Sequence, residues 1–167
     1  MGADTIDRKR NDRIRKNKTM NLLALDIATH TGFCTQTASG TWNLTPKKDE
    51  SKGMRLIRFK AKLREICDLE KIDLIVFEQL ATYGKFPNFI AAEMQGILKL
   101  FCEENNIEYR SYAPTAIKKF GTGKGNANKD KMIEAARKFK SDVETDDEAD
   151  AIILFQFALQ DLQLSIA

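Results

Sequence analysis

The 167-residue chain is poor in the residues on which many enzyme classes depend. It has one histidine, three cysteines, three prolines and one tryptophan. A zinc site built on several histidines is therefore excluded, and the sequence contains no Gly-x-Ser-x-Gly nucleophile motif. The single histidine, His30, is better explained as a loop or substrate-contacting residue than as a general base. Carboxylates and lysines must therefore supply any chemistry.

Long apolar runs and targeting segments are also missing. No run approaches the ~20 residues of a membrane span, and the polar N-terminus lacks the apolar core of a signal peptide. The cysteines form no Cys-x-x-Cys pair, which favours buried reduced thiols over zinc ligands or disulfides. They stand among apolar neighbours at Cys34, Cys67 and Cys102. We expect a cytosolic protein with one core, since 43% of the residues are hydrophobic.

The net charge is only +3, but it is unevenly distributed. Residues 1–20 carry seven Lys or Arg and three Asp, so we expect residues 1–19 to form a basic, disordered arm and residues 20–167 to fold. Residues 118–140 carry eight Lys or Arg and two acids, whereas residues 141–150 carry six acids and no base. This juxtaposition fits a phosphate-binding surface beside a metal site, although a solvated helix followed by an acidic helix start would look the same.

Hydrophobic periodicity predicts the element order βββαβαβααα, an α/β fold with a five-stranded mixed sheet flanked by helices on both faces. Strands are expected at 21–28, 72–77 and 107–112, and a hairpin at 32–38 and 41–45 with its turn at Ser39-Gly40. Helices are expected at 51–70, 87–104, 128–140 and 146–162, with a short helix from Pro114 and a glycine-rich loop at 121–128.

Four acidic residues are the most informative feature. Asp26 in LLALDIA and Glu78 in DLIVFEQ lie near the ends of apolar strands, where a lone carboxylate is costly unless a cation or donors compensate it. Asp147 and Asp150 are spaced i, i+3 at the start of an apolar helix, so both project from one face. Turn capping or helix-dipole complementation would explain individual members. Together they supply the oxygen ligands that Mg²⁺ prefers.

Two other segments are candidates for nucleic-acid contact. The loop GTGKGNANK does not fit the P-loop pattern, and its backbone either donates to DNA phosphates or faces solvent. We expect the lysines around it to contact DNA, namely Lys119, Lys124 and Lys131. Tyr83 and Phe86 follow Glu78 in a segment with glycine and proline. They are expected either to stack on unpaired bases or to anchor the next helix.

The motifs ALDIATHTG, IVFEQ, APTAIKKFGTGKGNANKDKM and DEADAIILF occur in the order and spacing of a known family. They resemble RuvC-type Holliday junction resolvases of the ribonuclease H-like fold, the phage-encoded members above all. The resemblance covers residues 21–160. It implies catalytic roles for six residues, which are Asp26, Glu78, Lys118, Lys129, Asp147 and Asp150. The chain departs from the family pattern at two places. After the first Asp the family usually has glycine and then serine or arginine, and this chain has Ile27, Ala28 and Thr29 there; Ala81 stands where the family has an aromatic residue.

This resemblance implies a metal-dependent endonuclease that cuts branched DNA and resolves four-way junctions by paired nicks. Two Mg²⁺ ions, for which Mn²⁺ would substitute, would be held by the four carboxylates, with Asp26 bridging them. Lys118 and Lys129 would neutralise charge in the transition state. The family also implies a homodimer in the cytosol of a bacterium or phage-infected host, because two symmetric sites suit two strands related by a two-fold axis.

Other functions stay open at this point. A ribonuclease H would cut the RNA strand of a hybrid as a monomer, and a broader nuclease of the same fold would also cut flaps and forks. A sugar-kinase or actin-like phosphate binder shares the pattern of LDIATHTG, but it needs a second copy of the fold, for which 167 residues leave no room. A DNA-binding module without catalysis would not need four carboxylates.

Overall fold

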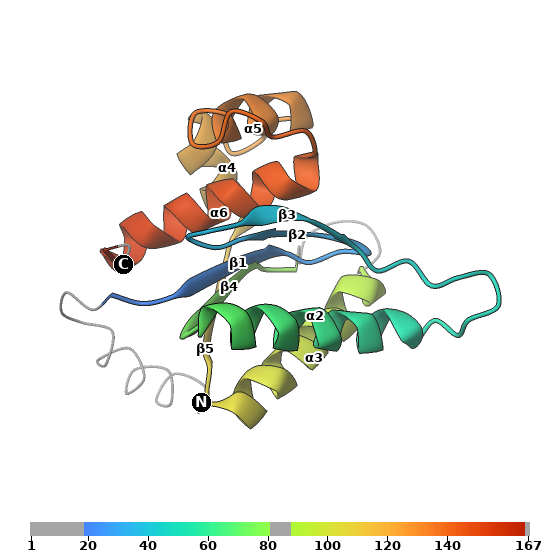
Figure 1. Cartoon of the computed structure of the whole chain (residues 1–167). Helices are drawn as coiled ribbons and strands as arrows, with labels where there is room; N and C mark the ends of the chain where they lie inside the picture. Colours follow the sequence, from blue (N-terminus) through green and yellow to red (C-terminus); the bar gives the residue numbers. More distant parts are fainter. Residues whose placement is uncertain (1–18, 81–87, 166–167) are drawn as a thin grey trace, which may run out of the picture.

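A computed structural model describes residues 19–80 and 88–165. One five-stranded sheet, in the order β3-β2-β1-β4-β5, has helices on both faces (Figure 1). β1 pairs antiparallel with β2 and parallel with β4, β2 pairs antiparallel with β3, and β4 pairs parallel with β5. The strands are β1 Leu22–Asp26, β2 His30–Cys34, β3 Ser39–Asn43, β4 Leu74–Glu78 and β5 Glu108–Tyr112. The helices are α2 Met54–Glu70, α3 Phe89–Asn105, α4 Pro114–Thr122, α5 Lys129–Ala136 and α6 Asp146–Leu162.

This order of elements and the mixed sheet confirm the predicted α/β class. The three cysteines are buried and form no disulfide, as their spacing predicted. Among the helices of the described ranges, none is long and apolar enough to cross a membrane.

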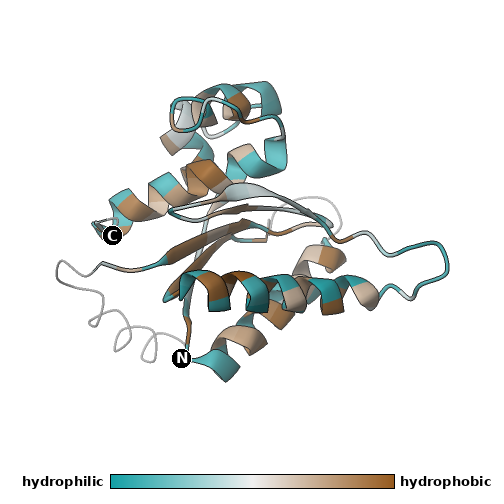
Figure 2. Cartoon of the chain, in the orientation of Figure 1, coloured by the Kyte–Doolittle hydropathy of each residue, from teal (hydrophilic) through white to brown (hydrophobic). Residues whose placement is uncertain are grey.

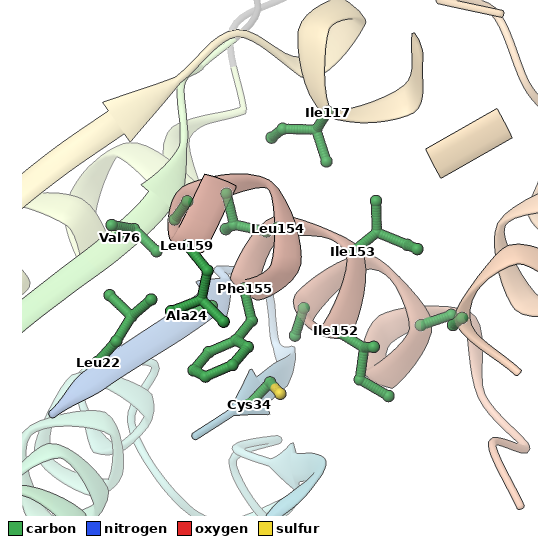
Figure 3. Close-up of a cluster of buried hydrophobic side chains, with 14 of the residues drawn as sticks. Leu22, Ala24, Cys34, Val76, Ile117, Ile152, Ile153, Leu154, Phe155 and Leu159 are labelled. Atoms are coloured by element: carbon green, nitrogen blue, oxygen red, sulfur yellow. The ribbon is translucent and has the colours of Figure 1, made fainter. Parts of the chain in front are cut away.

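The sheet separates two hydrophobic cores, because successive side chains of a strand point to opposite faces. Leu22 and Ala24 of β1 face α4, α5 and α6, and Leu23 and Leu25 face α2 and α3. β4 repeats this alternation one strand away. Figure 3 shows the first core, where α6 packs on β1 and β4. Coloured by hydropathy, β1 is brown, whereas α2 and α6 mix brown and teal stretches, as expected of helices with one buried side (Figure 2). A residue at the end of a strand therefore lies on the same face of the sheet as the residues two and four positions before it.

The predicted position of the hairpin turn was wrong. β2 ends at Cys34, which pairs with Ser39, so the turn is formed by residues 35–38. The Thr35 N–H donates to the Ala38 carbonyl at 2.8 Å, and Thr35 Oγ1 accepts from the Ala38 N–H at 3.1 Å. Gly40 lies inside β3 opposite Phe33, where a Cβ would come within 3.1 Å of the ring. The threonine hydroxyl closes this turn, and the glycine makes room for an aromatic side chain.

Several helix boundaries also differ from prediction: α2 begins at Met54 rather than 51, and α3 begins at Phe89 rather than 87. α5 ends at Ala136 rather than 140, because the chain then tightens into a turn in which the Lys138 and Phe139 N–H groups donate to the Ala135 and Ala136 carbonyls. α4 continues to Thr122, so Gly121 is helical rather than part of a loop. A Cβ at Gly121 would lie 2.8 Å from Cγ2 of Ile153. That glycine therefore serves the close packing of α4 on α6.

Candidate active site

Strand register places two of the predicted acids side by side. The β1–β4 ladder pairs Leu25 with Phe77, so Asp26 and Glu78 are the next residues at the carboxyl ends of neighbouring parallel strands. Asp26 follows Ala24 by two residues and Glu78 follows Val76 by two, and Ala24 and Val76 both face α6. The two carboxylates therefore lie on the α6 side of the sheet.

Helix α6 brings the other two acids to the same place. Thr145 caps the helix by accepting from the Glu148 N–H at 3.2 Å, and this starts α6 directly over β2. A Cβ at Gly32 would lie 1.8 Å from the Asp147 carbonyl oxygen, and Gly32 pairs with Asp26 across the β1–β2 ladder. The first turns of α6 thus come close to the end of β1.

The pKa values show that these acids act on one another. Burial raises the pKa of Asp26 well above its usual value, and the charges of Asp150, Glu78 and Asp147 raise it further. Burial and then Glu78 raise the pKa of Asp150 to about 7. Burial is also the main cause of the raised pKa values of Glu78 and Asp147. The structure therefore brings all four predicted carboxylates together.

The two predicted lysines lie beside this group in different ways. Lys118 of α4 lowers the pKa values of Glu78 and Asp150, which shows that its ammonium is close to both. Lys129, the first residue of α5, is 80% exposed and forms an ion pair with Asp146. That hydrogen bond raises the pKa of Lys129, with further contributions from Asp147 and Asp150. Lys129 is thus held at the rim of the group.

The residues predicted to contact DNA have different positions. Three exposed lysines follow one another along the chain: Lys119 lies on α4, Lys124 in the loop between α4 and α5, and Lys131 on α5. Tyr83 and Phe86 lie outside the described residues. His30 is exposed at the start of β2 and lowers the pKa of Asp147, so it borders the carboxylates. This position agrees with a substrate-contacting role for His30.

The sequence did not identify some supporting contacts. Glu148 is buried and accepts from Lys140 Nζ and from Ser39 Oγ, each at 2.7 Å. Gln95 of α3 is buried and donates to the Glu78 carbonyl at 3.0 Å. Glu148 therefore does more than place a negative charge at the start of a helix. No spacing rule would have found these contacts, because Ser39 and Glu148 are 109 residues apart in sequence.

The donor set fits a hard divalent cation. Carboxylate oxygens are the preferred ligands of Mg²⁺, and Asp150 Oδ1 is buried without a hydrogen-bond partner among the described residues. In the same ranges, no three His, Cys, Asp or Glu side chains are arranged as a ready-made metal cage. Close carboxylates repel one another until a cation lies between them, so we expect their side chains to rotate inward when a metal binds.

The sheet order, the helices on both faces and the acids at the ends of β1 and β4 define a ribonuclease H-like domain with a cluster of carboxylates at one end of its sheet. A sequence model described as Crossover junction endodeoxyribonuclease RuvC matches residues 28–156. The chain therefore belongs to the RuvC family. The matched range contains Glu78, Asp147 and Asp150, and Asp26 precedes it by two residues. Catalysis in this family depends on divalent metal.

Similarity to individual known proteins agrees with this family assignment. The chain is 42% identical over 64 residues to the RuvC crossover junction endodeoxyribonuclease of Brachyspira hyodysenteriae, covering 38% of this chain and 40% of that protein. It is 30% identical over 105 residues to that of Caldicellulosiruptor saccharolyticus, covering 60% and 63%. The matched parts thus span less than two thirds of these relatives. The structure of Thermus thermophilus RuvC in complex with a Holliday junction substrate has a TM-score of 0.69 at 16% identity, covering 86% of this chain and 96% of that one. That likeness shows the fold.

Proposed function

We propose that the chain is a metal-dependent endonuclease that hydrolyses phosphodiesters in branched DNA and resolves four-way junctions by paired nicks. The observation that supports this most strongly is the convergence of Asp26, Glu78, Asp147 and Asp150 with the ammonium of Lys118. The names of the matched relatives support branched DNA as the substrate, since these proteins are crossover junction endodeoxyribonucleases. Phosphodiester hydrolysis needs this combination of metal-binding oxygens and a cation for the phosphate.

In this proposal, Asp26, Glu78, Asp147 and Asp150 would hold two Mg²⁺ ions, for which Mn²⁺ would substitute. Bound there, the ions would activate water and stabilise the leaving oxygen. The chain itself fixes the ligand positions. Gln95 donates to the Glu78 carbonyl, and the Gln79 N–H donates to the Tyr112 carbonyl at 2.8 Å, so the backbone around Glu78 is held on both sides.

The lysines would act on the phosphate. Lys118 lowers the pKa values of Glu78 and Asp150, and near these acids its charge would offset negative charge that grows on the scissile phosphate. Asp146 holds Lys129 at the rim, from which its ammonium can reach the same phosphate. Lys119, Lys124 and Lys131 would contact neighbouring phosphates, and Tyr83 or Phe86 would stack on bases at the junction centre.

The rest of the chain would have simpler roles. Residues 1–19 would add DNA contacts that do not depend on base sequence, and residues 20–167 would form the nuclease domain. The protein would act in the cytosol of a bacterium or phage-infected host.

A homodimer would provide the two nicks, and helix α3 is the surface best suited to form it. Phe89 and Leu100 are 68% and 52% exposed, and with Gly96 they lie on one helix face at spacings of seven and four residues. A Cβ at Gly96 would meet no atom of residues 19–80 and 88–165 within 4 Å, so packing within the described part of the chain does not require glycine there. Glycine in a helix interior costs about 1 kcal/mol relative to alanine. A second copy of α3 crossing at Gly96 would explain it.

The direct test incubates purified protein with a labelled four-way junction, an RNA–DNA hybrid and a linear duplex, each with Mg²⁺ or with EDTA. We expect symmetric nicks in the junction only when Mg²⁺ is present. We also expect Mg²⁺ to raise the melting temperature, since a cation at tenfold its Kd stabilises a folded protein by about 1.4 kcal/mol. Cleavage of the hybrid alone would indicate a ribonuclease H activity instead. Absence of cleavage together with an unchanged melting temperature would contradict the proposal.

A further inference from the structure

The loop formed by residues 44–53, between β3 and α2, projects from the end of the sheet at which β1 finishes (Figure 1). Its base is fixed there. The Leu44 N–H donates to the Thr29 carbonyl at 2.9 Å, and the Leu44 side chain is buried. Asn43, which precedes it, pairs with His30 of β2. The loop therefore leaves the sheet beside the segment that follows Asp26.

A set of hydrogen bonds gives this loop a defined shape. Arg58 of α2 donates through Nη2 to both carboxylate oxygens of Glu50, at 2.7 and 2.6 Å, and through Nη1 to the Thr45 carbonyl at 3.1 Å. Glu50 also accepts from the Lys47 N–H at 2.7 Å. The Arg58 guanidinium lowers the pKa of Glu50, so this carboxylate is charged at neutral pH. One guanidinium nitrogen thus contacts both oxygens of Glu50 while the other holds the Thr45 carbonyl, and the loop is tied to α2 by these charge-assisted bonds.

The positive charge of this loop is only partly offset by its own acids, Asp49 and Glu50. Lys47, Lys48 and Lys52 are exposed, and no ion pair within residues 19–80 and 88–165 involves their ammonium groups. Arg58 already neutralises Glu50, which leaves Asp49 as the remaining acid of the loop.

The start of α2 adds to this positive surface. Gly53 provides no side-chain cap, and the first turn of α2 contains no acid. Arg55 lies in that turn, and its Nε is buried without a hydrogen-bond partner among the described residues. The N-terminus of a helix normally attracts negative charge, so basic residues there oppose the helix dipole. An anion bound from outside would relieve this repulsion between the basic residues and the positive end of the helix dipole.

We propose that the 44–53 loop is a DNA-backbone clamp: Lys47, Lys48 and Lys52 bind phosphates of the duplex arm next to the cleavage site. Helices α4 and α5 cover the sheet face opposite to α2, so this loop would hold DNA on the other side of the carboxylates from Lys119 and Lys124. Five residues of fully extended chain would span at most ~17 Å, and phosphates of one strand are ~3.4 Å apart along the axis. Turns at residues 48–50 and 52–53 shorten the loop, so its lysines reach fewer than about five successive phosphates. The inference rests on the proposed function, because the substrate arm is that of a branched DNA.

The test compares two double variants that each remove two positive charges. Lys48→Gln with Lys52→Gln alters the loop. Lys62→Gln with Lys71→Gln is the matched control: Lys62 lies further along α2, paired with Glu65, and Lys71 ends α2 beside Asn21, at the opposite end of β1 from Asp26. Glutamine suits position 71, because Gln163 adopts the same left-handed conformation at the end of α6. Both variants should melt like the unaltered protein.

Junction affinity is measured in EDTA over a range of salt concentrations, which separates binding from cleavage. Each lost phosphate contact flattens the slope of log K against log salt by ~0.9, so the loop variant should lose up to ~1.8 in slope. Its affinity should fall roughly tenfold at ~0.1 M salt, while the control matches the unaltered protein. If the unaltered protein binds and cleaves junctions and the loop variant gives a superimposable line, the clamp is wrong and the nuclease function stands. If the unaltered protein neither binds nor cleaves junctions, both proposals are wrong.

Discussion

Gly32 and Asp147 are in a contact that no side chain at position 32 would permit: a Cβ there would lie 1.8 Å from the Asp147 carbonyl oxygen. Gly32 is also the β2 partner of Asp26. One glycine thus lets the backbone of α6 approach the strand that neighbours Asp26. The convergence of the carboxylates depends on this approach.

Gly32→Ala should therefore damage the site more than the fold. The added methyl must push α6 away from β2, and overpacking of this kind costs about 1–3 kcal/mol. A displacement of ~1 Å at Asp147 and Asp150 is enough to slow cleavage ~100-fold. Thermal melting and junction cleavage are both measured. Ala61→Ser is the control, since it also adds one atom but at an exposed position of α2. Near-normal cleavage by Gly32→Ala would show that the contact is unimportant.

Asp26→Asn and Glu78→Gln each remove a ligand charge with little change in volume. Cleavage should fall by orders of magnitude, while the protein still folds and still binds the junction, because less negative charge then faces the phosphates. Binding is measured by gel shift and cleavage by product formation. Glu144→Gln, an exposed acid just before α6, serves as the control. A variant that retains half of the normal rate would remove that residue from the catalytic group.

The pH dependence of stability should report on Asp150. Its pKa is raised from 3.8 to about 7 in the folded protein, so the folded state binds the proton more tightly than the unfolded state. The resulting stabilisation is complete below the unfolded pKa and is lost as the pH rises through about 7. With allowance for partial exposure, it is on the order of 2 kcal/mol. Melting in EDTA at pH 5 and pH 8 should show a smaller drop for Asp150→Asn than for the unaltered protein or for the exposed Asp68→Asn. An equal drop would contradict the shift.

The two lysines near the glycine-rich loop should differ in kind. Lys129 is held by Asp146 at the rim of the carboxylates, so Lys129→Ala should slow cleavage more than it weakens binding. Lys124 is exposed in the loop between α4 and α5, so Lys124→Ala should weaken binding and lower its salt dependence instead. Single-turnover rates and affinities are measured for both. Equal effects on affinity alone would mean that Lys129 belongs to a surface patch.

Deleting residues 1–19 should leave folding and the position of cleavage unchanged. The seven cations in residues 1–20 have no apolar stripe beside them and so add nothing to a packed core. Each phosphate that they neutralise steepens the dependence of log K on log salt by ~0.9. Junction affinity of the shortened protein should be weaker at low salt with a flatter slope. Superimposable salt curves would show that the arm is passive.

Local pattern was enough to predict the element order and the class. Period-two alternation and continuous apolar runs mark the strands, and helical spacing marks the helices. Asp26 and Glu78 were recognisable because a charge that ends an apolar strand needs a compensating partner. The hairpin turn was misplaced, because the hydroxyl of Thr35 and the contact of Gly40 with Phe33 decide it, and neither is visible as a turn dipeptide.

The sequence by itself determined which residues are chemically suited to the site, because residue type and local spacing are written in it. Only the tertiary structure decided that strands β1 and β4 pair in the register that sets Asp26 beside Glu78. It also decided that Gly32 lets α6 come close and that Ser39 and Lys140 fix Glu148. These contacts join residues far apart along the chain, and their energies depend on packing and burial that exist only once the sheet and its helices have assembled.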